Sequence, residues 1–183
     1  MTHFPIHSMS TAPEASREAL EVLAATFGLI PNIAGAMATS PVLINCLVSV
    51  FGKVHGGSLS EPEIQVLLLT NAVTNRSEWA SAFHSALALQ QGISAADVDA
   101  IRSRSLPGDP RLAALSALTR ALIERRGKLG KEDVDAFLAP GFAPHHLLEV
   151  IAVSAASTIT NYTANVTTPQ LETAFAEHAW RAA

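Results

Sequence analysis

The chain has 183 residues, of which 49% are hydrophobic and 5% aromatic, and its formal net charge is -4. This length can bury a sizeable core, and the charge gives no electrostatic basis for nucleic acid or an anionic membrane surface as a partner. Only 15% of the residues are charged, which is low for a soluble monomer, so we expect subunit interfaces to cover part of the surface.

Apolar residues recur at helical spacing, and caps, prolines and glycines mark the boundaries, which predicts an all-α protein. Ser40 with Pro41 and Ser60 with Glu63 are the clearest helix starts, because they match an N-cap with proline at N1 and a capping box. The segment "LPGDP" separates two halves at residues 106–110. In chain order, the expected helices cover residues 11–28, a short segment between Pro31 and Pro41, 41–54, a segment that starts at 60 and carries an apolar run at 64–69, 77–91, a segment that starts at 94, 110–126, 132–138, 144–166 and 169–180.

The two halves resemble each other in one stretch. "LALQQGISAADVDAIRS" at residues 87–103 can be aligned with "LIERRGKLGKEDVDAFLA" at 122–139, with Gly92 over Gly127 and one residue inserted. This alignment predicts an internal repeat of helix, glycine and short helix, whereas coincidence in an alanine-rich helical sequence is the alternative.

Neither a membrane span nor an export signal is expected. The longest nearly uncharged run, residues 150–169, is too polar in its second half to cross a hydrocarbon layer. The N-terminus has neither a basic start nor an apolar stretch of signal-peptide length, so a cytoplasmic location is expected. Cys46, the only cysteine, can form no internal disulfide and is expected to be a small buried side chain on a helix.

The stretch "LSEPEIQVLLLTNAVTNRSEWASAFHSALALQQGIS" resembles the core of the carboxymuconolactone decarboxylase and alkylhydroperoxidase D (AhpD) superfamily. "FGLIPNIAGAMATSPVL" and "LEVIAVSAASTITNYTAN" are similar to the flanking segments of its peroxidase-related subfamily. The resemblance spans about residues 20–181. It implies an AhpD-like helical bundle that forms a single domain over residues 1–183, with the family core at 59–104 and a related second half at 110–181. It also implies association into trimers or hexamers.

The redox residues of the family are replaced in this sequence. Redox members carry a glutamate, then a C-x-x-C pair, then a histidine, and these positions correspond here to Gln65, Ser77, Ala80 and His84. Alanine supplies no nucleophile, and a neutral amide does not exchange a proton near neutral pH. Disulfide-cycling peroxidase activity is therefore not expected, and we expect no cofactor.

Neither a serine nucleophile in place of the missing cysteines nor a metal site is expected. On a regular helix, Ser77 and His84 would lie roughly 10 Å apart along the axis, which is beyond hydrogen-bond reach. Ser81 is better spaced, but a helical serine usually bonds its own backbone carbonyl. His146 and Glu149 have helical spacing without a third matching ligand, so no metal site is expected.

What remains is a remnant pocket around His84, which is the candidate catalytic residue, although a structural hydrogen-bonded histidine is the alternative. The remnant positions are Ser77 and Gln65, and the candidate substrate-binding residues are Arg76, Glu78, Trp79 and Tyr162. Three functions stay open. The first is small-molecule binding or non-redox acid-base chemistry at this pocket. The second is a lactone decarboxylase-like or isomerase-like enzyme, which needs an anion-binding group such as Arg76. The third is a non-catalytic oligomeric structural or partner-binding protein.

Overall fold

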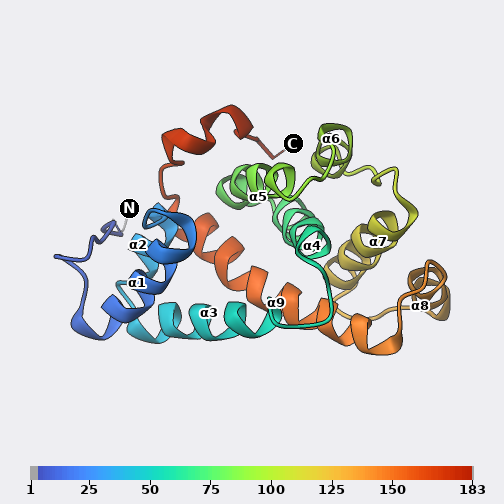
Figure 1. Ribbon diagram of the computed structural model, residues 1–183, viewed down its shortest axis with the longest axis horizontal. Coiled ribbons are helices and arrows are strands. Elements are labelled where there is room, and N and C mark those ends of the chain that lie inside the picture. Colours follow the sequence, from blue (N-terminus) through green and yellow to red (C-terminus); the bar gives the residue numbers. More distant parts are fainter. Residues whose placement is uncertain (1–3, 183) are drawn as a thin grey trace.

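The computed structural model describes residues 4–182, and this range folds into nine α-helices and one 3-10 helix without a β-strand (Figure 1). The prediction of an all-α protein is confirmed. The elements are α1 (Glu14–Phe27), α2 (Asn32–Met37), α3 (Pro41–Val54), α4 (Glu61–Thr74), α5 (Glu78–Gln90), α6 (Ala95–Arg102), α7 (Pro110–Glu124), α8 (Lys131–Leu138), α9 (Pro144–Thr167) and the 3-10 helix η1 (Thr173–His178).

The helix starts follow the capping signals of the sequence. The Ser40 hydroxyl accepts a hydrogen bond from the backbone N–H of Leu43 at the start of α3, at 3.3 Å. At the start of α4, the Glu63 carboxylate accepts from both the backbone N–H and the hydroxyl of Ser60, each at 2.8 Å. The bonds from the backbone N–H groups of Leu43 and Ser60 satisfy groups that a helix end leaves without partners, so the predicted starts are confirmed.

Helix α4 lies in the middle of the molecule, between α5 and α7 (Figure 1). Every residue from 63 to 73 is buried, which explains why this helix is apolar around most of its circumference. One core cluster joins it to α6, α7, α8 and α9, and a second cluster joins α1, α2, α3 and α5. The helix therefore presents one of its faces to each half of the molecule.

The last predicted helix is wrong in length. Residues 169–180 do not form one α-helix, because only a single 3-10 segment is present, at Thr173–His178. Thr168 ends α9 in the left-handed conformation, at φ 44°, and residues 169–172 are not helical. A proline at 169 cannot continue a helix from the preceding turn, which is consistent with this break.

The expectation for Cys46 is also wrong, because its side chain is exposed on α3. The buried face of α3 is formed by Ile44 and Leu47. Cys46 is two residues from Ile44 and therefore lies on the opposite side of the helix, at about 100° per residue.

Side-chain hydrogen bonds hold the C-terminal segment against the helices. The Glu172 carboxylate accepts from the backbone N–H of Asn32, at 2.5 Å, and from the indole N–H of Trp79, at 3.0 Å. The Arg102 guanidinium donates to the backbone carbonyls of His178 and Ala179, both at 2.9 Å. One carboxylate thus links the C-terminal segment to α2 and to α5.

The two halves of the predicted repeat start their short helices alike. Asp97 and Asp133 both occupy the third helical position, and each carboxylate accepts a hydrogen bond from the residue that precedes its helix. The preceding helix ends differ by one residue. Gly92 adopts the left-handed conformation after α5, whereas both Arg126 and Gly127 have a positive φ after α7.

Within residues 4–182, no helix combines the length and the apolar character that a bilayer span requires.

Candidate functional site

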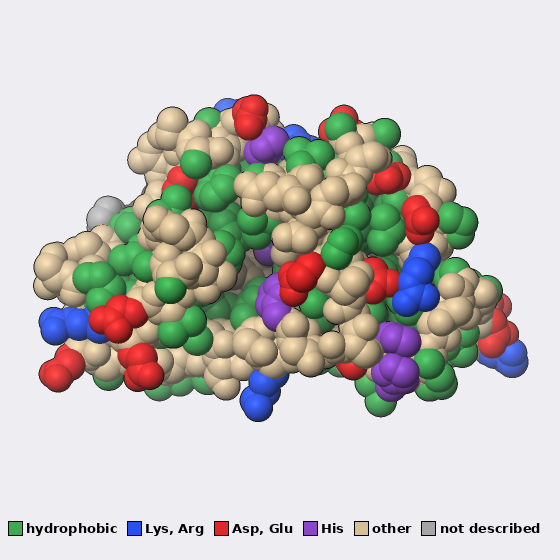
Figure 2. Space-filling model, in the orientation of Figure 1, with side chains coloured by type: hydrophobic (Ala, Val, Ile, Leu, Met, Phe, Trp, Pro, Cys, Tyr) green, Lys and Arg blue, Asp and Glu red, His purple; other side chains and the backbone are tan. Residues whose placement is uncertain are grey.

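A cavity of about 570 Å³ lies between the N-terminal helices and the α4–α5 pair. Helices α1, α2 and α3 form one wall, α4 and α5 form the other, and α9 contributes Thr160. Figure 2 shows a hollow at the centre of one face, with histidine and acidic side chains together at its edge. The lining is mostly apolar, with a few polar side chains, which is the usual composition of a small-molecule site.

His84 and Gln65 meet on the wall of this cavity. Nδ1 of His84 lies 3.1 Å from Oε1 of Gln65, and both side chains are buried. An amide oxygen can only accept a hydrogen bond, so Nδ1 carries the proton in this contact. Nε2 of His84 makes no hydrogen bond within residues 4–182, and it is left as an acceptor for a bound molecule.

Burial keeps the His84 imidazole neutral. The pKa of His84 is lowered from 6.5 to about 3, chiefly because burial removes water from the charged form and secondly because of the charge of His55. An imidazole with such a pKa is a weak general base near neutral pH. His84 is therefore better suited to accept a hydrogen bond than to take up a proton.

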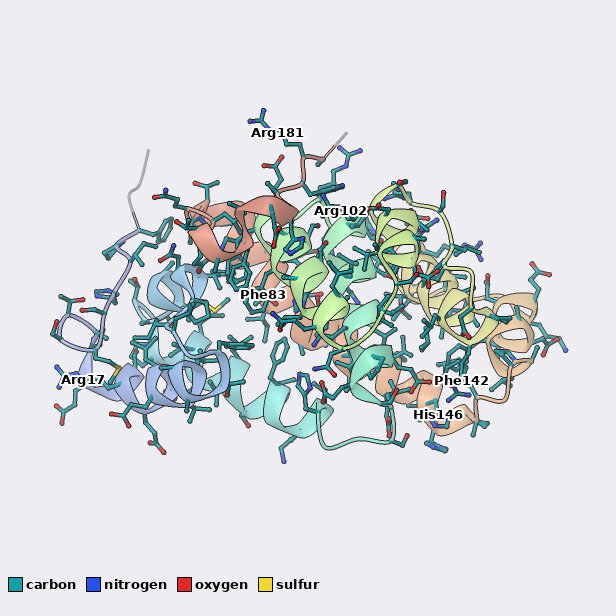
Figure 3. All side chains as sticks on the ribbon, turned by 45° about the horizontal axis from the view of Figure 1, so that its top comes forward. Arg17, Phe83, Arg102, Phe142, His146 and Arg181 are labelled. Carbon is teal, nitrogen blue, oxygen red and sulfur yellow. The ribbon has the colours of Figure 1, made fainter. Side chains whose placement is uncertain are left out.

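Aromatic rings form the floor beside His84. The ring centroid of Phe83, which is labelled in Figure 3, lies 4.9 Å from that of Trp79 and 5.2 Å from that of Phe27. The centroids of Phe175 and His84 lie 5.0 Å and 5.3 Å away, both in edge-to-face geometry. Close-packed rings of this kind give the cavity a rigid apolar surface that fits a flat ligand.

The predicted site residues divide into three groups. Gln65, Trp79 and His84 line the cavity. Ser77 is buried just before α5, and its hydroxyl has no partner among the described residues. The three predicted side chains that are exposed and do not line the cavity are Arg76, Glu78 and Tyr162.

The physical reasons for these three positions are local. Arg76 occupies the left-handed turn between α4 and α5, at φ 54°, which leaves it exposed at the end of the helix pair. Glu78 begins α5, and its carboxylate accepts from the backbone N–H of Ala182 at 3.4 Å. Tyr162 lies on the outward side of α9, with 58% of its surface exposed, because Asn161 and Ala164 are on the buried side.

Two ionisable residues, His55 and Glu61, also line the cavity and were not singled out from the sequence. Nδ1 of His55 lies 2.8 Å and 3.0 Å from the two carboxylate oxygens of Glu61. Both residues belong to the cavity lining. Helical spacing could have revealed Glu61, because Glu61, Gln65 and Leu68 follow one another at the i, i+4 and i+7 positions of α4.

The charge of the lining restricts what the cavity can bind. Within the described part of the chain, no lysine or arginine lines it, and Glu61 is the one carboxylate that does. An anion would have to leave water without a cation to compensate, which is costly. No group of three or more His, Cys, Asp or Glu side chains in residues 4–182 is arranged to hold a metal ion.

Comparison with solved structures identifies the fold. The structure of an uncharacterized peroxidase-related protein with an AhpD core, from Ralstonia eutropha JMP134, is similar to this one. The match covers 94% of this chain and 93% of that chain, with 16% sequence identity and a TM-score of 0.83. The match to an uncharacterized peroxidase-related protein from Silicibacter sp. TM1040 covers 95% of this chain and 92% of that chain, with 16% identity and a TM-score of 0.79. The match to a cysteine-to-alanine variant of the debrominase Bmp8, in complex with 2,3,4-tribromopyrrole, covers 97% of this chain and 96% of that chain, with 17% identity and a TM-score of 0.80.

No family model matches the sequence, and no curated protein does. The structural likeness extends over nearly the whole of each chain, so the chain has the AhpD-like fold predicted from its sequence. At this level of identity, the likeness concerns the fold alone.

Proposed function

We propose that this chain is a peroxidase-related member of the AhpD superfamily that binds a neutral, mostly apolar small molecule in the cavity beside His84. The observation that carries this proposal is the cavity of about 570 Å³ on whose wall His84 and Gln65 meet. The imidazole is held neutral and offers an acceptor, while aromatic rings cover the surface beside it. These features favour a flat ligand with one hydrogen-bond donor.

Disulfide cycling does not fit this site. Ala80 occupies the position of the attacking cysteine in redox members, and Cys46 lies exposed on α3, outside the cavity lining. A thiol cycle needs a thiolate that meets a second thiol to form a disulfide, and this sequence has one cysteine. The chemistry that we propose for the cavity is therefore of the acid-base kind.

A lactone decarboxylase-like function has less support. It requires a cation near the bound carboxylate, and Arg76 was the candidate for this role. Arg76 is exposed at the turn between α4 and α5 and does not line the cavity. The complex of the similar debrominase with a halogenated pyrrole instead supports a neutral aromatic ligand.

Binding can be tested with 2,3,4-tribromopyrrole as a probe. We expect saturable binding by isothermal titration calorimetry, and we expect Val48→Trp to weaken it roughly tenfold or more, because the larger side chain fills the cavity. Val42→Trp is the matched control, since it makes the same change at an exposed site on the same helix. Equal affinity in Val48→Trp and the unmodified protein would contradict binding at this site.

Association into a homo-oligomer is a further part of the proposal. Helix α9 exposes Leu148, Ile151, Tyr162 and Val166, and residues 150–168 contain no charged side chain. Exposed apolar positions along a largely uncharged stretch of helix are typical of a surface that another subunit covers. The low charge of the whole chain supports the same conclusion, and the resemblance to the family favours a trimer or hexamer.

Light scattering coupled to gel filtration tests this association. We expect an oligomer at micromolar concentration, and we expect Tyr162→Glu combined with Val166→Glu to dissociate it, because the buried carboxylates would lose water without a partner. Ala117→Glu, at an exposed position of α7, should leave the mass unchanged. A monomeric unmodified protein would refute the proposal.

A further inference from the structure

The mouth of the cavity holds a second polar pair, His55 and Glu61, which the resemblance to the superfamily does not explain. His55 follows the last residue of α3, and Glu61 is the first residue of α4. The short loop between them therefore brings an imidazole and a carboxylate together from two helix ends. About a third of the His55 side chain and less than half of Glu61 are exposed, so both can meet solvent and a bound molecule.

Two contacts fix the orientation of the His55 ring. Both carboxylate oxygens of Glu61 lie within 3.0 Å of Nδ1, which places the proton on that nitrogen. The ring also stacks on Phe51, with 5.9 Å between centroids and 28° between planes, and Phe51 itself lines the cavity. Nε2 makes no hydrogen bond within the described residues, so it is free to accept a proton.

The His55 ring donates from Nδ1 to the Glu61 carboxylate and lies at the C-terminal end of α3. His84 has no such partners, since its hydrogen-bonding neighbour is the neutral amide of Gln65. The two histidines of the cavity are therefore built for different tasks.

We propose that His55, positioned by Glu61, is the proton-accepting group of the cavity, and that its ligand is a neutral aromatic or heteroaromatic molecule that carries one acidic hydrogen. Nε2 removes this hydrogen as a proton, and the electron pair of the broken bond stays on the ligand. The proton then returns to another ligand atom or leaves to water, so no oxidant or reductant is needed. His84 holds the ligand through a hydrogen bond to its own Nε2. This inference rests on the proposed function, because it requires that a neutral ligand occupy the cavity.

The elimination of 5-nitrobenzisoxazole tests the assignment, since this neutral aromatic probe needs only a base. The base takes the C–H proton, the C–H electrons form the nitrile, and the N–O bond breaks with its electrons on oxygen. We expect the unmodified protein to accelerate the reaction over buffer, and His55→Gln to lower kcat/KM by at least about tenfold. The exposed His145→Gln variant is the matched control and should retain the full rate.

Glu61 acts through His55, so a Glu61 variant should change kcat and leave KM nearly constant. Glu61→Gln keeps the shape of the side chain and removes its charge, so kcat should fall severalfold while KM changes by less than about twofold. A rise in KM as large as the fall in kcat would mean that Glu61 only shapes the mouth of the cavity. That result would overturn its assignment as a positioning residue.

Two other outcomes would overturn the His55 assignment. One is a rate in His55→Gln equal to that of the unmodified protein, and the other is a loss confined to His84→Asn. Binding of 2,3,4-tribromopyrrole to His55→Gln, measured by calorimetry, separates the two proposals. If the variant and the unmodified protein bind it equally but neither accelerates elimination, the proposed function stands and the His55 inference fails. If neither binds it, the proposed function itself fails.

Discussion

Arg111→Met is expected to lower the free energy of unfolding by about 2 to 3 kcal/mol, because it leaves a buried carboxylate without its cation. Nε of Arg111 lies 2.6 Å from Oε1 of Glu63, and only 7% of the surface of Glu63 is exposed. The guanidinium carbon also lies 3.7 Å from the ring centroid of Phe142, which is labelled in Figure 3. The expected loss is smaller than for a fully buried pair because Arg111 is itself partly exposed.

The pKa of Glu63 shows how strongly this carboxylate is held. Burial alone raises it, but the hydrogen bonds from Ser60 and Arg111 outweigh burial and hold the pKa below its usual value. The same carboxylate caps α4 and reaches α7, so its loss affects the contact between these two helices.

Urea denaturation followed by circular dichroism measures this effect. Lys131→Met is the matched control, since it breaks an ion pair with Asp135 that lies within α8 and is largely exposed. We expect this control to cost less than about 0.5 kcal/mol. A loss for Arg111→Met as small as that of the control would show that the buried pair contributes no more than a surface pair.

His84→Asn is expected to remove part of the acid sensitivity of the protein. In the unfolded chain the imidazole has a pKa of about 6.5, whereas the pKa of His84 in the folded state is about 3. Between these values the unfolded state binds a proton that the folded state does not, so the free energy of unfolding rises with pH across this window. This contribution is fully present above pH 6.5 and is lost as the pH falls.

The size of this change in stability follows from the two pKa values. From pH 7 to pH 5, the unmodified protein should lose about 2 kcal/mol more stability than His84→Asn, as measured by urea denaturation at both pH values. Asparagine carries an N–H close to the place of Nδ1, so the hydrogen bond to Gln65 can be kept. His145→Asn, at an exposed position, should behave like the unmodified protein. Equal pH dependence in His84→Asn would mean that the imidazole is not held neutral in the folded protein.

The sequence predicted the helices well because their ends carry local signals. Ser40 and Ser60 start helices through bonds to residues three positions on, which are visible in the sequence itself. The helix predicted after Thr168 was wrong for the opposite reason. Its conformation depends on Glu172 and Arg102, which bind partners far away in the chain, and helix propensity does not report such contacts.

The lining of the candidate site was predictable only in part. Gln65, Trp79 and His84 were found through the resemblance, and they line the cavity. Arg76 and Tyr162 were chosen because they are close to these residues in sequence or motif, but the side of the helix or turn on which they lie directs them outward. No periodic pattern includes His55, since it lies at a helix end, and the fold alone brings it to the cavity.

The carboxylate of Glu172 has a thermodynamic consequence. It bonds the indole of Trp79, a cavity residue, and at the same time anchors the C-terminal segment at the backbone of Asn32. A ligand that moves the indole would therefore act on the carboxylate that anchors this segment, and any coupling between the two sites is reciprocal.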